Sequence, residues 1–481
     1  MKRILFILLF PVFTALSFAQ STNDHSGYVD LNYMARLSDN SLINIPYRIF
    51  NINVDHQNGD LSIKSTLALE HQLRSNTYFL TNSSPQDFHW DLRELYMQWF
   101  TSFGEIRVGK QIHTWGSTDE NSPIDVVNPL DYYYLFSAGA ERKLGTFSIA
   151  SDIYWKNLKL GFVFSPLHNT HRTPSGDNNF PIKLPITPQE YQIFPLHDQP
   201  FEGGFYTVSS RNFGEISYYY FSGYDRLFNF TGVSTYSNTD NSSFVQVELV
   251  YGFRKTQALG MGAILLNDLF TIRADMGLFD TRDQNSSISR ELAGVAFGFN
   301  NYIFVDSLSF PMEEKARYYQ STFQIEVELP ADINFIGQIF IYDTLYYSSN
   351  DFPVPQEINI PNLEIDPDNF TPADFFTPGI GAPMAVLSKK LAFFSLKRDF
   401  LDSQLNINLT AMLDLDKTGY KGTVPGALYS FQTEYNLLED LKAILGITKI
   451  IGADGHPDGD QYRFNQMEDF SHMRLELKYF F

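Results

Sequence analysis

Short segments along the whole chain alternate apolar and polar residues, and this pattern most constrains the fold. In 323–329 every second residue is apolar and the residues between are Gln or Glu; 244–254, 404–413 and 472–481 repeat the pattern. Successive side chains of a β-strand point to opposite faces, so a period of two over seven to eleven residues predicts strands with one apolar and one polar face. No segment shows a long helical periodicity, and the chain is predicted to be all-β.

The alternation alone suits a water-soluble sheet as well as a membrane barrel, and composition decides between them. Aromatic residues make up 16% of the chain, with 44 Phe and 28 Tyr, yet the mean hydropathy is slightly negative, −0.20. A soluble domain this aromatic is expected to contain continuous apolar core strands. One face in lipid and one in water explains the combination better and predicts an outer-membrane β-barrel.

The beginning of the chain predicts export. Residues 1–19 combine Lys2 and Arg3 with an apolar run and small residues before Gln20, as in a secretory signal peptide. We therefore expect a single barrel over 20–481, located in the outer membrane of a Gram-negative bacterium, with lipid and lipopolysaccharide around it. The chain has no cysteine and a formal charge of −20. This acidic balance argues against a nucleic-acid partner and against simple phosphate-selective transport.

The last ten residues supply a second indication of this class. Segment 472–481 alternates to its end and places Leu477, Tyr479 and Phe481 on one face. The pattern resembles the C-terminal signal that the barrel-assembly machinery of bacteria recognises. A plain final strand is the alternative.

The spacing of the strands predicts their number and the two ends of the barrel. Links of a few residues, such as Asn58-Gly59-Asp60 and Lys156-Asn157, alternate with long polar segments. Bacterial barrels have short periplasmic turns and long outer loops. We predict about 16 strands, with 14 to 18 as the range.

One stretch, 105–136, departs from the pattern after its first residues. It begins as a strand, breaks at Trp115-Gly116 and continues as an acidic loop over 113–136. Because this loop follows a tight turn and one strand, it begins at the outer mouth. Apolar residues in 124–130 need something to pack against, and the lumen is the nearest candidate. The loop is therefore predicted to narrow the lumen.

Three short motifs in this stretch resemble a known family. They are R-V-G-K-Q (107–111), W-G (115–116) and D-V-V-N-P-L-D (125–131). Together they are similar to the R-x-G-[RK]-Q, W-G and N-x-x-N-P-x-D stretch of porin-like outer-membrane proteins of largely undefined function. Asp125 stands where that pattern has Asn. The resemblance covers about 30 residues and implies a barrel that moves small or hydrophobic molecules; it supplies no catalytic residue and no substrate.

The loop acids have two interpretations of equal weight. In one, Asp125 and Asp131 accept backbone N–H groups and hold the turn that Asn128-Pro129 begins. In the other, the acids line a constriction and favour cations, with Arg107 as a partner. A third interpretation leaves them simply solvated. The candidates for the constriction are Arg107, Trp115, Asp119, Glu120, Asp125, Asn128 and Asp131.

Two other acidic regions carry weaker hypotheses. Segment 348–383 has seven prolines, six acids and no Lys or Arg, which predicts an outer lid or a partner-binding loop. Its 366–369 portion, or Asp454, Asp458 and Asp460 in the last loop, could bind a divalent cation. Neither spacing matches a defined calcium loop, so solvated acids are favoured, and no metal or cofactor is predicted.

Channel function is the main hypothesis, with two alternatives. The transported solute, small and either hydrophobic or cationic, is not specified by the sequence. The first alternative is an outer-membrane anchor whose acidic, aromatic loops bind a surface partner. The second is a barrel hydrolase using His113 and Ser117 near Asp119, although no G-x-S-x-G or comparable signature is present.

Overall fold

The computed structural model describes most of the chain. The described residues are 21–72, 88–136, 141–174, 179–180, 182, 193, 200–238, 245–284, 304–351, 371–416, 421–422 and 425–481. The signal peptide predicted over 1–19 and the calcium hypothesis for 366–369 both lie outside them. Within the described ranges, no helix is both long and apolar enough to cross a membrane.

Eighteen antiparallel strands form one closed sheet, which confirms the predicted fold class with a strand number at the upper limit of the predicted range. In chain order they are β1 (Ser21–Arg36), β2 (Tyr47–Asn58), β3 (Leu61–His71), β4 (Phe88–Thr101), β5 (Gly104–Gln111), β6 (Thr146–Trp155), β7 (Leu158–Ser165), β8 (Glu202–Arg211), β9 (Gly214–Tyr224), β12 (Lys255–Leu266), β13 (Phe270–Arg282), β15 (Lys315–Leu329), β16 (Ile333–Ser348), β17 (Lys390–Phe400), β18 (Leu405–Asp414), β19 (Ala427–Asn436), β20 (Leu441–Ile451) and β21 (His472–Phe480).

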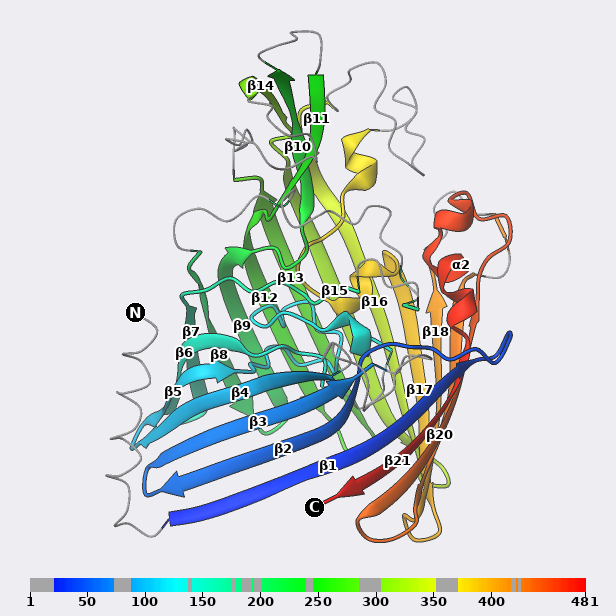
Figure 1. Ribbon diagram of the computed structural model, residues 1–481. Helices are drawn as coiled ribbons and strands as arrows, with labels where there is room; N and C mark the ends of the chain where they lie inside the picture. Colours follow the sequence, from blue (N-terminus) through cyan, green and yellow to red (C-terminus); the bar gives the residue numbers. More distant parts are fainter. Residues whose placement is uncertain are drawn as a thin grey trace.

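Each strand pairs with the next of this order, and the last pairs with the first (Figure 1). The seam between β1 and β21 runs from Tyr28 opposite Phe480 to Arg36 opposite His472. Beyond it, the Gly27 N–H donates to the Phe481 carbonyl over 2.9 Å. Closure matters because an open sheet edge in lipid would leave unpaired backbone groups.

Three further strands lie outside the barrel. β10 (Asn229–Asn238), β11 (Val245–Gly252) and β14 (Phe304–Pro311) form a separate antiparallel sheet. It projects from the upper end of the barrel in Figure 1. The strand predicted within 244–254 therefore exists as β11, but it is not part of the membrane wall.

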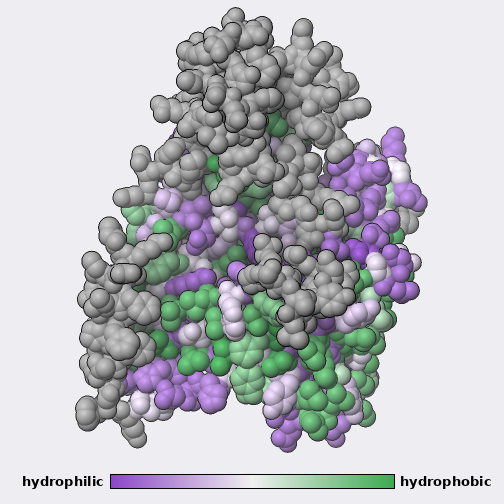
Figure 2. Space-filling model, in the orientation of Figure 1, coloured by the Kyte–Doolittle hydropathy of each residue, from purple (hydrophilic) through white to green (hydrophobic). Residues whose placement is uncertain are grey.

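The two faces of the wall are the reverse of those in a water-soluble protein. On β13, Met276 is 51% exposed on the outside while its neighbour Asp275 is 1% exposed on the inside. On β15, Phe323 is 45% exposed and Gln324 is fully buried. Figure 2 shows hydrophobic side chains gathered on the barrel wall. Such an apolar outer belt suits lipid, because acyl chains solvate methyl groups and leave polar groups unpaired.

The two ends of the barrel differ as predicted from the loop lengths. Turns of a few residues join β2 to β3, β6 to β7 and β17 to β18 at the lower end of Figure 1. Three successive residues of the last turn, Leu401, Asp402 and Ser403, have φ between 52° and 67°, which reverses the chain tightly. Long connections lie at the opposite end.

Several long connections pack inside the barrel or against its mouth. The segment after β5 contains η2 (Tyr132–Tyr134), and the segment before β17 contains η4 (Pro372–Phe375) and η5 (Pro383–Val386). Between β20 and β21 lie η6 (Gly459–Gln461), α2 (Arg463–Met467) and η7 (Glu468–Phe470). An outer lid was predicted over 348–383, but the described end of this segment lies inside the barrel. Ile380 and Ala382 are buried against the inner face of β15.

Candidate functional site

The segment that follows β5 turns away from the wall, and hydrogen bonds of the Asn128 side chain hold it in place there. The Asn128 side-chain oxygen accepts the His113 N–H over 2.6 Å, and its amide nitrogen donates to the Leu144 carbonyl over 2.7 Å. One buried amide thus joins the beginning and the end of the loop. Its position favours the turn-holding role for Asn128 over a role at the pore.

Apolar residues of the loop pack on the inner wall. Trp115, Ile124, Val126 and Val127 belong to one buried cluster with wall residues that include Phe279. The Trp115 ring lies 5.6 Å from the rings of both Tyr206 and Tyr219, between centroids. The wall strands beneath the loop carry glycines that make room for this packing; a Cβ at Gly204 would lie 2.7 Å from the Trp115 ring. Trp115 is consequently an anchor and does not line open space.

The loop is fixed to β13 just before its tip. The Asp275 carboxylate accepts the Ser117 N–H over 2.8 Å, the Thr118 N–H over 2.8 Å and the Thr118 hydroxyl over 2.8 Å. β5 and β13 are separated by several strands on either side of the barrel. The loop therefore runs along the inner face of the barrel from β5 to β13.

Asp119 and Glu120 form the tip of the loop and are its exposed acids. Their side chains are 54% and 61% exposed. Asp119 accepts a hydrogen bond from Gln324 over 2.7 Å and lies 3.8 Å from Arg273, while Glu120 pairs with Arg142. Glu120 has φ of 55°, a conformation that turns the chain back on itself. Of the residues predicted for a constriction, these two reach open space.

Asp125 and Asp131 are buried in ion pairs. Asp125 lies 2.6 Å from Lys143 and accepts the Trp115 N–H over 3.1 Å. Asp131 caps η2 and lies 3.1 Å from Arg172. Burial raises the pKa of both carboxyls, and their cationic partners oppose this shift. Both acids hold the loop together, as the turn-capping interpretation expected.

Arg107 faces the lumen from β5 but lies away from the loop tip. It pairs with Asp152 of the neighbouring strand over 3.2 Å, and no loop acid is its partner among the described residues. The predicted pairing of Arg107 with an acid of the loop does not occur there.

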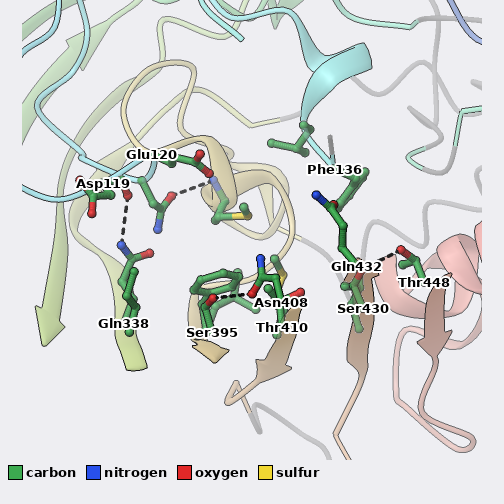
Figure 3. Close-up of a pocket in the computed structure, with 18 of the residues that line it drawn as sticks. Asp119, Glu120, Phe136, Gln338, Ser395, Asn408, Thr410, Ser430, Gln432 and Thr448 are labelled. Carbon is green, nitrogen blue, oxygen red and sulfur yellow. Dashed lines mark hydrogen bonds between the residues drawn. The ribbon is translucent and has the colours of Figure 1, made fainter. Parts of the chain in front are cut away.

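A cavity of about 510 Å³ lies between the loop tip and the wall formed by β16 to β21 (Figure 3). Asp119, Glu120 and Phe136 border it on the loop side. On the wall side it is lined by Gln338, Ser395, Asn408, Thr410, Ser430, Gln432 and Thr448, among others. These wall residues were not among those predicted from the sequence. They stand on the polar faces of strand segments such as 404–413, and the polar faces of the other strand segments look the same.

A second cavity of about 310 Å³ adjoins the first beside β1, β2 and β19 to β21. It shares Gln432 and Arg474 with the first and is lined by charges of both signs. Most of these are paired: Lys442 lies 3.2 Å from Glu434 and Arg474 lies 2.8 Å from Glu476. The two cavities therefore meet at Gln432 of β19 and Arg474 of β21.

The residues suggested for hydrolysis do not form a catalytic pair. His113 Nε2 lies 2.9 Å from the Ser148 hydroxyl, while the Ser117 N–H binds Asp275. Burial lowers the pKa of His113 to about 3. Within the described ranges, no group of three or more His, Cys, Asp or Glu side chains is arranged to hold a metal ion, and Asp454, Asp458 and Asp460 form none.

These features define a class. A closed antiparallel barrel with an apolar outer belt and polar lumen is an outer-membrane β-barrel of the kind found in Gram-negative bacteria.

No family model and no curated protein matches the sequence. Among solved structures, the chain is similar to Pseudomonas aeruginosa OccK2 (OpdF) in complex with glucuronate, at 9% identity over 95% of this chain and 97% of that chain with a TM-score of 0.48. It is also similar to Pseudomonas aeruginosa OpdK with vanillate (10%, 95% and 98%, TM-score 0.47) and to Acinetobacter baumannii OccAB3 (10%, 96% and 99%, TM-score 0.47). At these values the likeness extends to barrel architecture and to nothing finer.

Proposed function

We propose that the protein is a passive outer-membrane channel for small solutes, narrowed by the 113–136 loop. The observation that supports this proposal is the larger cavity between the loop tip and the β16–β21 wall. It is bordered by Asp119 and Glu120 on one side and by uncharged polar residues on the other. A sealed structural anchor has no need of such a polar cavity.

The exposed carboxylates at the tip give the cavity a preference for cations. A unit charge about 6 Å from a passing ion in water changes its energy by about 0.7 kcal/mol, which is about threefold in relative permeability. Arg142 and Arg273 reduce the effect because each lies next to one of the two acids. The preference is accordingly modest.

Conductance across a planar lipid bilayer tests the proposal. We expect steady channels whose cation-to-anion permeability ratio falls about threefold in the Asp119→Asn/Glu120→Gln variant. The matched control is Asp402→Asn/Glu439→Gln, which removes two charges in exposed short turns and should leave the ratio nearly unchanged. A bilayer that stays sealed with every form of the protein contradicts channel function, and a ratio equal in both variants contradicts the role of the tip.

Binding of a surface partner is a second candidate, and the β10–β11–β14 sheet favours it. This sheet projects beyond the wall and has no place in the membrane (Figure 1). Replacing 229–252 and 304–311 by short linkers separates the two functions: a channel keeps its conductance, whereas an anchor loses partner binding.

A further inference from the structure

The wall of the larger cavity carries four hydroxyl side chains in one row. Across four consecutive strands, Ser395 of β17 lies opposite Thr410 of β18, Thr410 opposite Ser430 of β19, and Ser430 opposite Thr448 of β20. All four line the cavity, as Figure 3 shows. Directly opposed residues have Cβ atoms about 5 Å apart, so the row is a continuous hydroxyl surface around that side of the barrel.

The rows on either side of the hydroxyls differ in chemistry. An apolar row lies two positions along each strand toward the long loops. In it Phe393 lies opposite Met412, and Met412 lies opposite Leu428. An amide row lies two positions along each strand toward the short turns. It consists of Asn408 and the opposite residue Gln432. A solute moving through the cavity therefore meets apolar groups, then hydroxyls, then amides.

The two polar rows retain hydrogen-bonding capacity. Ser395 donates to the Asn408 side-chain oxygen over 2.9 Å, and the Ser430 and Thr448 hydroxyls lie 3.1 Å apart. In the part of the chain that the structure describes, the Thr410 hydroxyl and the Asn408 amide nitrogen donate to no other protein group. Each retained group can bind a solute hydroxyl in place of water.

The charges that line the cavity are compensated. Arg474 lies 2.8 Å from Glu476 and donates to Gln432, and Arg142 pairs with Glu120. Asp119 accepts a hydrogen bond from Gln324 and lies near Arg273. No side chain of the hydroxyl row is ionisable, so the wall offers little to hold an ion of either sign. The exposed tip carboxylates remain good acceptors for hydroxyl donors.

We infer that this surface binds an uncharged sugar or a short neutral oligosaccharide. The inference rests on the proposed channel function and names its solute class. A pyranose presents hydroxyls around its edge and apolar C–H groups on its faces. The hydroxyl and amide rows match the edge, and Phe393 and Phe136, which both line the cavity, match the faces. The volume of about 510 Å³ lies within the ~300–1,000 Å³ of small-molecule sites.

Block of the ion current by sugars tests the inference. Maltose and sucrose are added to open channels in a planar bilayer and are compared with polyethylene glycol of similar mass, glucuronate and glucosamine. We expect the neutral sugars to reduce the current at lower concentration than the other three. If polyethylene glycol of equal mass blocks equally well, the cavity excludes by size alone and the inference is wrong. Stronger block by glucuronate or glucosamine also overturns it, because the cavity then selects charge.

Two variants locate the binding surface. Thr410→Val/Thr448→Val removes two hydroxyls at constant shape and should raise the half-blocking concentration of maltose about tenfold. Thr433→Val is the matched control, because Thr433 lies on β19 between Ser430 and Glu434 and opposes the outward residue Ile407. The sugar-free current of each variant reports whether its barrel is intact. An unchanged half-blocking concentration in the double variant contradicts the role of the row.

The same experiment separates the two proposals. Channels that conduct but ignore sugars leave the channel proposal intact and refute the sugar site. If no form of the protein conducts, the channel proposal fails, and calorimetric titration of the detergent-solubilised barrel with maltose then decides the sugar site. Absence of heat at millimolar maltose overturns it.

Discussion

In the proposed channel, the position of the loop tip depends most on Asp275. It is 1% exposed and receives two backbone N–H groups and one hydroxyl from Ser117 and Thr118. Asp275→Asn keeps the size of the side chain, and its remaining oxygen can take the place of Oδ2, which accepts all three bonds. The substitution removes the negative charge of that acceptor. Hydrogen bonds to a charged group contribute about 1.5–3 kcal/mol each and those between neutral groups about 0.5–1.5 kcal/mol each, so loop docking should weaken by about 3 kcal/mol.

A loss of about 3 kcal/mol changes the docking equilibrium by about 100-fold. Two neutral bonds still hold the tip, because Gln324 accepts the Asp119 N–H and the Thr322 hydroxyl donates to the Asn121 carbonyl. We therefore expect a loop that leaves the wall intermittently. Single-channel recordings should show brief steps to higher conductance, and backbone amides over 117–121 should exchange hydrogen faster than in the unaltered protein.

The control substitution lies on the same strand. Asp280→Asn changes an exposed residue of β13 that pairs with Arg317, and it should alter neither the current steps nor the exchange. If Asp275→Asn also leaves both measurements unchanged, the tip is held by other contacts and the reasoning about Asp275 is refuted.

Three further substitutions test the packing of the loop, the lipid-facing belt and the buried histidine. Gly260→Ala would place a Cβ 2.4 Å from Ile124 Cγ2, so we expect a loop displacement costing about 1–3 kcal/mol and a raised mean conductance. Met261→Arg puts a charge on the outer face at the middle of β12 and should reduce folding into lipid vesicles by about 2–4 kcal/mol; Gln257→Arg, nearer the end of the same strand, should cost about 0–1 kcal/mol. Burial lowers the pKa of His113 from 6.5 to about 3, so the stability from its neutral ring is complete above pH 6.5 and is lost as the pH falls toward 3. Current noise should rise in that window, and less so in His113→Gln.

Each of these three predictions has its own control or contradicting outcome. Gly446→Ala is the control for the glycine test, because the nearest atoms to its Cβ would lie 3.6 Å away, an ordinary contact. If Gly260→Ala and Gly446→Ala give the same conductance, the wall can absorb the extra methyl group. Equal folding of the two arginine variants would contradict the assignment of the lipid-facing belt. A His113→Gln variant as noisy in acid as the unaltered protein would place the pH dependence elsewhere.

The barrel could be predicted because its determinants are local. A strand such as β15 shows its two faces within a few residues, and a turn such as 401–403 shows itself by its length and polarity. The preferred strand number was too low because these signals do not identify every strand individually. β11 has the same alternation as a wall strand and yet pairs with β10 outside the barrel. Only the long-range pairing separates the two cases.

The candidate site was predictable in part. The 113–136 loop stood out by its acids and prolines, and the sequence offered pore-lining and turn-capping roles without deciding between them. The structure divides the acids: Asp119 and Glu120 border the cavity, whereas Asp125 and Asp131 lie in buried ion pairs. The division depends on Asp275, 157 residues from Thr118. No local pattern identifies such a partner.

The cavity wall formed by β16 to β21 was not predicted from the sequence, for a related physical reason. A single Ser or Thr on the polar face of a strand is indistinguishable from any other lumen residue. The hydroxyl row exists because three registers agree, and each register is fixed by a different connection and a different hydrophobic face. In the proposed channel, loop and wall have separate roles. Apolar contacts and Asp275 would set how far the loop closes the lumen, while Ser395, Thr410, Ser430 and Thr448 would set what the remaining space binds. Substitutions that loosen the loop should therefore change conductance more than sugar affinity, and substitutions in the row should do the reverse.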